Sequence, residues 1–317
     1  MKTMKVYGEF TLIENIRKAF AKAGGRLKVA IGDDTAVISE KSGRFLLATT
    51  DMMVEGVHFT ASLSPFKVGQ KAIASNVSDI AAMGGLPMYG LVSAGLRKDV
   101  PVKYAKELLN GIKKEASRYG VKIIGGDTVS SKVNIINITL LGEVAGKKYA
   151  LRSGAKEGDF ILVTGALGSG AAALLLSGIY VPKINVSFAA RAVQAGLING
   201  MIDISDGLSS ELNHLAKESG TGAFIDKNSI PLSSSARYAA KRMKKDAHAL
   251  ALSGGEDYEL LFTVRPKKLR SVLVLVKRLR VKVTVIGAMM HKEFGVKIAG
   301  FDGELTGLAR KGYDHFA

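Results

Sequence analysis

Apolar and polar positions change their spacing repeatedly along this chain, and the changes predict strands that alternate with helices. In the first half, residues 68–83 and 103–119 repeat their apolar positions with helical spacing, and each run stops at glycine. Short apolar runs, which are typical of strands, lie around these helices. The strands predicted in this half are residues 44–49, 88–94, 121–124 and 133–144.

The second half shows the same mixture after a polar, glycine-containing stretch at residues 151–159. We place a domain boundary there, because 317 residues are many for one core, and predict domains at residues 1–150 and 151–317. Each half is predicted to be α/β or α+β. The further predicted elements are strands 160–164, 201–204, 258–264 and 281–286, an Ala/Leu-rich helix after loop 165–170, and helices 207–218 and 265–282.

Composition narrows the class of protein. The chain has no cysteine, which excludes disulfides and thiol nucleophiles. Its first 20 residues do not have the apolar core of a signal peptide, and the longest apolar stretch, residues 171–181, is too short to cross a membrane. We therefore expect a cytoplasmic protein without a membrane partner.

The charge of the chain raises the question of a nucleic-acid partner. The sequence contains 45 Lys and Arg but only 28 Asp and Glu, which gives a net charge of +17. The basic residues gather in residues 236–245 and 265–282. In the second segment they flank an apolar helical stripe, which is typical of a helix with a solvated cationic face. No nucleic-acid recognition motif accompanies them, so we expect no specific nucleic-acid partner.

The acidic residues are distributed in a more informative way. Six short segments place them beside Gly, Ser or Thr where an apolar run stops or a turn begins. Mg²⁺ binds oxygen ligands that come from several parts of a chain, so this distribution favours a magnesium site. The segments are residues 32–34, 49–51, 78–79, 125–127, 203–206 and 254–257.

Most of these acids also have an ordinary structural explanation. Acids are common in turns, which covers Asp34 and Asp51. Gly126 and Asp127 fit a tight turn, and Ser205 or Asp206 fits a helix N-cap. Likewise, a lone histidine such as His58 is more often structural than catalytic, and Arg152 at the predicted boundary fits either a surface charge or a phosphate contact in a cleft.

Two of the acids are harder to explain without a cation. Asp79 lies among apolar and small residues of a predicted helix, and Asp203 interrupts a strand-like run. A buried carboxylate is costly unless it is paired or binds metal. No Ser-His-Asp order, G-x-S-x-G or H-E-x-x-H motif is present, and loop 165–170 does not have the Gly-Lys-Ser/Thr of a P-loop. Carboxylates that bind phosphates through Mg²⁺ indicate phosphoryl transfer.

Read in order, these segments resemble the thiamine-monophosphate kinase family, which shares a superfamily with aminoimidazole ribonucleotide synthetase. The resemblance runs from about residue 8 to residue 316. The matching segments are residues 31–36, 49–59, 71–84, 125–128, 151–155, 202–208, 253–260 and 311–316.

The resemblance implies an N-terminal α/β domain that dimerises through its sheet, an α+β C-terminal domain, and a homodimer. It implies in-line transfer of phosphate from ATP to thiamine monophosphate, with Mg²⁺ as cofactor and ADP and thiamine diphosphate as products. It implies contacts with ATP from Gly126, Asp127, Arg152 and Ser205, with Arg152 as the catalytic residue, and contacts with thiamine monophosphate from His58, Glu256 and Tyr313. The Mg²⁺ ligands that it implies are Asp34, Thr49, Thr50, Asp51, Asp79, Asp127, Asp203 and Asp206.

One departure affects the second domain. The family often has a Pro/Arg-rich stretch before the Asp-Ile-Ser-Asp motif, whereas residues 181–195 are short and do not contain one. The substrate contacts of this region stay open. An ATP-dependent synthetase of the same superfamily, acting on another phosphorylated metabolite, is the alternative enzyme, and a basic nucleic-acid-binding protein is a more remote one.

Overall fold

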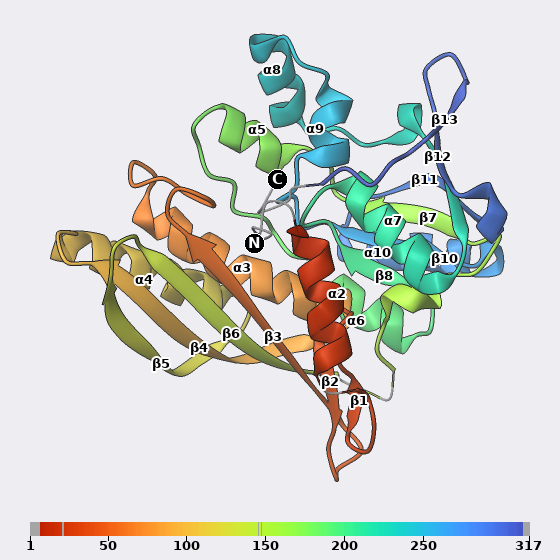
Figure 1. The fold of residues 1–317 in the computed structure, drawn as a ribbon. Coiled ribbons are helices and arrows are strands. Elements are labelled where there is room, and N and C mark those ends of the chain that lie inside the picture. Colours follow the sequence, from red (N-terminus) through yellow and green to blue (C-terminus); the bar gives the residue numbers. More distant parts are fainter. Residues whose placement is uncertain (1–6, 21, 145, 147, 313–317) are drawn as a thin grey trace.

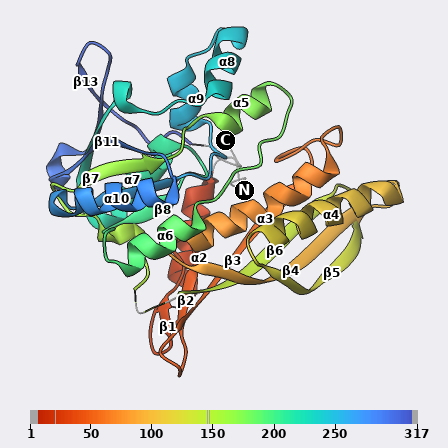
Figure 2. The same cartoon turned by 180° about the vertical axis from the view of Figure 1, so that it is seen from behind.

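A computed structural model describes residues 7–20, 22–144, 146 and 148–312 of the chain. Its two sheets follow one another along the sequence (Figures 1 and 2). The mixture of strands and helices predicted for each half is confirmed. The boundary between residues 150 and 151 stays a prediction. Among the described residues, no helix combines the length and the apolar character that crossing a membrane requires.

The first sheet has the strand order β1-β2-β3-β6-β4-β5. Its central pair, β3 and β6, is antiparallel over ten residues, whereas β4 and β5 run parallel. Because the chain must cross over between parallel strands, helix α4 connects β4 to β5. The strands are β1 (Leu27–Val29), β2 (Ala36–Ser39), β3 (Phe45–Val54), β4 (Leu86–Arg97), β5 (Lys122–Ser131) and β6 (Ile135–Val144).

Helices α3 (Pro65–Ala82) and α4 (Val102–Arg118), both predicted, pack against each other over one face of this sheet (Figures 1 and 2). Two glycines allow the contact. A Cβ on Gly69 would lie 2.3 Å from the Leu108 carbonyl oxygen, and one on Gly111 would lie 1.9 Å from that of Phe66. Any larger side chain would push the helices apart. Helix α2 (Glu9–Ala19) precedes the sheet and has no predicted counterpart.

The second sheet has the order β13-β12-β9-β11-β7-β10-β8. Alternate residues of β7 and β10 face opposite layers, as the two-residue period of a strand requires. Leu162 and Phe262 pack with α6 and α10, whereas Ile161 and Leu261 pack with α7. The strands are β7 (Phe160–Thr164), β8 (Met201–Asp203), β9 (Gly222–Asp226), β10 (Leu260–Val264), β11 (Val283–Met290), β12 (Val296–Ala299) and β13 (Leu305–Gly307).

The helices of this half cover both faces of its sheet (Figure 1). Helix α10 is the predicted basic helix, and it buries Val272 and Val276 while its charged residues face outward. The helices are α5 (Ser169–Leu175), α6 (Val186–Gln194), α7 (Leu208–Ser219), α8 (Ser234–Met243), α9 (Ala247–Ser253) and α10 (Leu269–Leu279). The single 3₁₀ turns are η1 (Arg152–Gly154), η2 (Lys227–Ser229), η3 (Pro266–Lys268) and η4 (Lys292–Phe294).

The largest hydrophobic core belongs to both halves. One continuous cluster of buried side chains includes Leu47 and Ile80 of the first half together with Val193 and Phe262 of the second. Helix α3 makes this connection, because it packs against β3 and β6 on one side and against α6 and β8 on the other. The C-terminal half of α3 is therefore held rigidly between the two sheets.

Candidate active site

Three carboxylates meet where α3 passes the second sheet. Asp34 lies in the turn between β1 and β2, Asp79 in the last turns of α3, and Asp203 at the end of β8. One oxygen from each lies within 4.8 Å of the others. We call these three residues the carboxylate cluster. Its members are 45 and 124 residues apart, so only the packing of α3 against both halves brings them together.

Two of the three carboxylates are buried, Asp79 is half-buried, and the charges of the cluster repel one another. Asp34 is 8% exposed and Asp203 is 2% exposed. Burial, followed by the charges of Asp51 and Asp203, raises the pKa of Asp79 well above its ordinary value. Burial and then the charge of Asp34 raise the pKa of Asp203 to about 8. Such a group of acids favours either protons or a cation.

Hydroxyl groups hold the carboxylates in place. Thr49 donates a hydrogen bond of 2.6 Å to Asp79 Oδ2, and Ser78 donates one of 2.6 Å to Asp203 Oδ2. By contrast, Asp34 Oδ2 is buried without a hydrogen-bond partner. An unpartnered carboxylate oxygen on a residue that lies beside two other acids fits a hard divalent cation such as Mg²⁺, which takes oxygen ligands.

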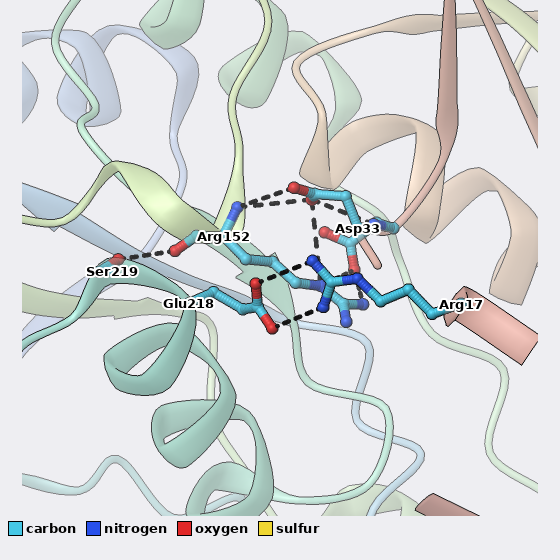
Figure 3. Close-up of polar contacts among 6 residues, drawn as sticks. Arg17, Asp33, Arg152, Glu218 and Ser219 are labelled. Atoms are coloured by element: carbon cyan, nitrogen blue, oxygen red, sulfur yellow. Dashed lines mark hydrogen bonds and ion pairs between the residues drawn. The ribbon is translucent and has the colours of Figure 1, made fainter. Parts of the chain in front are cut away.

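Arg152 lies beside the cluster and is paired with its member Asp34. Figure 3 shows Arg152 between Asp33 and Ser219. Its Nε is 3.2 Å from Asp34 Oδ1, and its main-chain N–H is 3.3 Å from Asp33 Oδ2. Its carbonyl oxygen accepts a 2.8 Å hydrogen bond from Ser219. Burial alone would lower the pKa of Arg152, but the charge and hydrogen bond of Asp34 outweigh burial and raise it. In this structure the guanidinium is thus held by a carboxylate.

A second ion pair supports this corner of the site. Arg17 of α2 contacts Glu218 of α7 at 3.1 Å, next to Arg152 in Figure 3. A Cβ on Gly32 would lie 2.8 Å from the Arg17 guanidinium carbon, so glycine leaves the room that this arginine occupies. The turn that carries Asp34 is therefore braced by α2 as well as by Arg152.

Next to the cluster lies a cavity of about 700 Å³. It has an apolar side, made mainly of methionine, leucine, isoleucine and valine, and a polar side rich in carboxylates. The residues that line it are Leu12, Ile13, Thr50, Asp51, Met52, Met53, Val54, Val57, His58, Lys71, Ser75, Asp79, Leu174, Ser205, Asp206, Gly254, Gly255, Glu256 and Tyr258. Asp51, His58, Ser205, Asp206 and Glu256, which the sequence predicts as site residues, thus share one space with Asp79.

Strand geometry separates the predicted set on β3. Thr49 bonds to Asp79 of α3, and Asp51 bonds to Ser75 of the same helix. Successive strand residues face opposite sides, so the Thr50 side chain points away from these two. Its hydroxyl instead donates to the Ile138 carbonyl oxygen at 3.1 Å. The hydroxyl of Thr50 therefore does not join the carboxylates, and its role as a ligand stays a prediction.

Gly126 and Asp127 also lie apart from the cluster. The prediction of a strand that ends before them, at residue 124, is wrong, because both belong to the exposed edge strand β5. A Cβ on Gly126 would lie 1.8 Å from the Val92 carbonyl oxygen, so glycine is needed for the pairing with β4. The Asp127 carboxylate accepts the Thr128 N–H at 2.8 Å. Tyr313 lies outside the described residues.

Local structure answers two of the alternative explanations. The N-cap residue of α7 is Gly207, which has no side chain to cap the helix, so neither Ser205 nor Asp206 is the N-cap. The His58 Nδ1 accepts the Val54 N–H at 3.1 Å, which orients the ring at the cavity wall. This hydrogen bond gives His58 a structural role, and its contact with substrate stays a prediction.

Sequence reasoning missed two charged residues of the site. Lys71 lines the cavity, one turn of α3 before Ser75 and two before Asp79, and this four-residue spacing was a signal. Glu211 of α7 accepts the Asp206 N–H at 3.2 Å. Burial and the charge of Asp206 raise the pKa of Glu211 well above its ordinary value. Sequence reasoning explained Asp206 as a candidate N-cap and did not consider Glu211, which lies five residues after it.

Both halves of the chain match known domains. Residues 32–144 match the family described as AIR synthase related protein, N-terminal domain, and residues 156–298 match its C-terminal domain. The fold and the paired domains thus define an AIR synthase related protein. A solved structure of HypE, 20% identical with a TM-score of 0.72, shares the fold.

More similar proteins identify the family within that class. A thiamine-monophosphate kinase of Escherichia coli K12 is 35% identical over 98% of both chains. One of Aquifex aeolicus is 36% identical over 84% of this chain and 88% of its own. The solved structure described as AaThiL complexed with AMPPCP and TMP is 34% identical, covers 99% of both chains and has a TM-score of 0.86. The chain belongs to the thiamine-monophosphate kinase family of enzymes.

Proposed function

We propose that this protein transfers the γ-phosphoryl group of ATP to thiamine monophosphate, giving ADP and thiamine diphosphate. The observation that carries the proposal is the carboxylate cluster beside the 700 Å³ cavity. It occurs in a chain that resembles AaThiL, which was solved with AMPPCP, an ATP analogue, and TMP. An acidic cluster next to a partly apolar cavity suits a phosphorylated organic acceptor together with a metal-bound nucleotide.

Asp34, Asp79 and Asp203 would hold Mg²⁺. Thr49 and Asp51 lie beside them and would be ligands as well. The proposal also includes Thr50, Asp127 and Asp206 as Mg²⁺ ligands. The unpartnered oxygen of Asp34 and the mutual repulsion of the three acids support this assignment. When bound, Mg²⁺ supplies positive charge that offsets the negative charge developing on the transferred phosphoryl group.

The remaining site residues divide between the two substrates. Ser205 lines the cavity and follows the cluster residue Asp203 by two positions, and we assign it to ATP together with Arg152, Gly126 and Asp127. His58 and Glu256 line the cavity itself, and we assign them to thiamine monophosphate together with Tyr313. The acceptor phosphate is already ionised at neutral pH, so its oxygen attacks the γ-phosphorus in line without a strong general base.

A homodimer belongs to the same proposal. Apolar side chains are exposed along the edge of the first sheet, including Ile124 at 58% and Val129 at 57% on β5. A second copy over this surface would remove them from water. Gly126 and Asp127 lie on the same strand, so a dimer would place them at the subunit boundary. Domains at residues 1–150 and 151–317 and a cytoplasmic location complete the proposal.

The test is a product assay with purified protein, ATP, Mg²⁺ and thiamine monophosphate. ADP and thiamine diphosphate should form in equal amounts, and leaving out either the metal or the acceptor should stop ADP release. Free inorganic phosphate in place of a phosphorylated acceptor would contradict the kinase assignment and favour the alternative, an ATP-dependent synthetase. A panel of other phosphorylated metabolites, assayed in parallel, shows whether thiamine monophosphate is the preferred acceptor.

A further inference from the structure

Lys71 is a buried cation on the wall of the cavity. Its side chain is 3% exposed, and its ammonium group is bonded to the Glu256 carboxylate, which is 19% exposed. Lysine is almost never buried unless it is paired, because removing its charge from water is costly. This pair joins α3 to the segment before β10, so it links the two halves of the chain at the cavity.

The surroundings of Lys71 are strongly acidic. Asp51, Asp79, Asp206 and Glu256 line the same cavity, and among its described lining residues Lys71 is the only lysine or arginine. Arg152 is not among them, and its guanidinium is held by Asp34. Among the described lining residues, an anionic acceptor would therefore meet one ammonium group and no guanidinium group.

The position of Lys71 along α3 relates it to the carboxylate cluster. Lys71, Ser75 and Asp79 are four residues apart, so they lie along one face of the helix. Eight residues span about 12 Å along a helix axis. The face thus carries an ammonium group at one end and a cluster carboxylate at the other, with the Ser75 hydroxyl, which bonds to Asp51, between them.

The segment that carries Glu256 is held in an unusual conformation. Glu256 has φ +60° and Tyr258 has φ +51°, values that side chains larger than glycine rarely adopt. Main-chain hydrogen bonds keep it there, from Glu256 N–H to the Ser205 carbonyl at 2.6 Å and from Tyr258 N–H to the Ile204 carbonyl at 2.8 Å. Backbone strain of this kind is found at ligand-binding sites. Here it aims the Glu256 carboxylate at Lys71.

We propose that Lys71 binds the phosphate of the acceptor, and that Glu256, assigned above to thiamine monophosphate, acts on this substrate through Lys71, as a positioning residue that holds the Lys71 ammonium in place. The inference rests on the proposed function and adds the group that recognises the acceptor phosphate. An ammonium group has three N–H donors, so one can stay on Glu256 while the others bond to phosphate oxygens. Lys71 therefore distinguishes thiamine monophosphate from unphosphorylated thiamine.

Calorimetric binding without nucleotide tests this role, with thiamine monophosphate and thiamine as the two ligands. Lys71→Met should weaken binding of thiamine monophosphate by about 10- to 100-fold, as the loss of one charge-assisted contact does, and leave thiamine binding nearly unchanged. Lys71→Arg should retain part of the preference for the phosphorylated ligand. Lys67→Met removes the same charge from an exposed position one turn earlier on α3 and should alter neither affinity.

Two further variants separate phosphate binding from a purely structural link. Glu256→Gln keeps the Lys71 charge, so the preference for thiamine monophosphate should persist. The double variant Lys71→Met with Glu256→Met leaves no unpaired buried charge and should fold even if Lys71→Met does not. If the double variant still prefers thiamine monophosphate as strongly as the unmodified protein, or if Lys71→Met and Glu256→Gln weaken both ligands equally, the proposal is wrong.

The outcome also distinguishes this inference from the proposed function. If the unmodified protein neither binds thiamine monophosphate nor phosphorylates it, the kinase assignment fails, and the role of Lys71 fails with it. If the unmodified protein binds and phosphorylates thiamine monophosphate, and Lys71→Met does so equally well, only the role of Lys71 is refuted.

Discussion

Replacing Arg152 by alanine should destabilise the metal-free protein and make it depend on Mg²⁺ for stability. The change removes the partner of Asp34, whose carboxylate is buried and already close to Asp79 and Asp203. Breaking a buried ion pair on one side costs about 3–5 kcal/mol. Arg152 is 22% exposed, so we expect the lower end of that range, about 3 kcal/mol.

Mg²⁺ should return much of the lost stability, because it replaces the missing positive charge. A ligand at 100 times its dissociation constant stabilises the folded state by about 2.7 kcal/mol. The assay is urea unfolding of the unmodified protein and of Arg152→Ala, in EDTA and in saturating Mg²⁺. Arg152→Lys keeps the positive charge but not the two parallel N–H groups of the guanidinium. Its free energy of unfolding in EDTA should lie between those of the unmodified protein and Arg152→Ala.

A double-mutant cycle with Asp34→Asn isolates the pair. If the arginine acts through Asp34, Arg152→Ala should cost much less in the Asp34→Asn background than in the unmodified protein. Additive effects, or a loss under about 0.5 kcal/mol in EDTA, would refute the reasoning. The separate prediction that Arg152 contacts ATP is read at saturating Mg²⁺. There Arg152→Ala should lower kcat/KM for ATP by about one to two decades and leave thiamine monophosphate binding unchanged.

Two further predictions concern carboxyl groups with raised pKa values. Asp203→Asn should stabilise the metal-free protein, because it removes a buried acid that repels its neighbours. The same change should raise the Mg²⁺ concentration needed for activity. Unchanged unfolding in EDTA together with an unchanged Mg²⁺ titration of activity would count against the carboxylate cluster as a metal site. Burial raises the pKa of Glu259 from 4.5 to about 7, so this residue stays protonated to a higher pH in the folded protein than in the unfolded chain. The stabilising contribution of Glu259, at most about 3 kcal/mol, is complete below pH 4.5 and is lost as the pH rises through 7. Between pH 4.5 and 8, the free energy of unfolding should therefore change less steeply with pH in Glu259→Gln than in the unmodified protein.

The pattern of apolar positions predicted most of the regular elements. Helices α3 and α4 have strong periodicity and clear glycine stops, and strand β7 occupies the predicted residues. The C-terminal part of β5 was missed because Gly125 and Gly126 are typical of turns. In the structure Gly126 continues the strand, since only glycine fits against the Val92 carbonyl. Such a reason depends on the neighbouring strand and leaves no local sign.

The candidate site was predictable where a single residue conflicts with its surroundings. Asp79 in an apolar helix and Asp203 in a strand both drew notice, and both belong to the carboxylate cluster. The partners were not predictable in the same way. The pairs Arg152 with Asp34 and Lys71 with Glu256 join residues 118 and 185 positions apart. Only the tertiary packing of the two halves brings these opposite charges together.

The continuous core described above limits how this protein can move. Domains that meet through small polar surfaces swing apart freely, whereas a large apolar contact resists separation. Opening a hinge between the two sheets would expose Ile80, Val193 and Phe262 to water, at roughly 1.5–3 kcal/mol for each large side chain. Substrates should therefore reach the cavity without a separation of the two sheets. Heating should unfold both halves in one transition, because the unfolding of either half would expose the core residues of the other half to water.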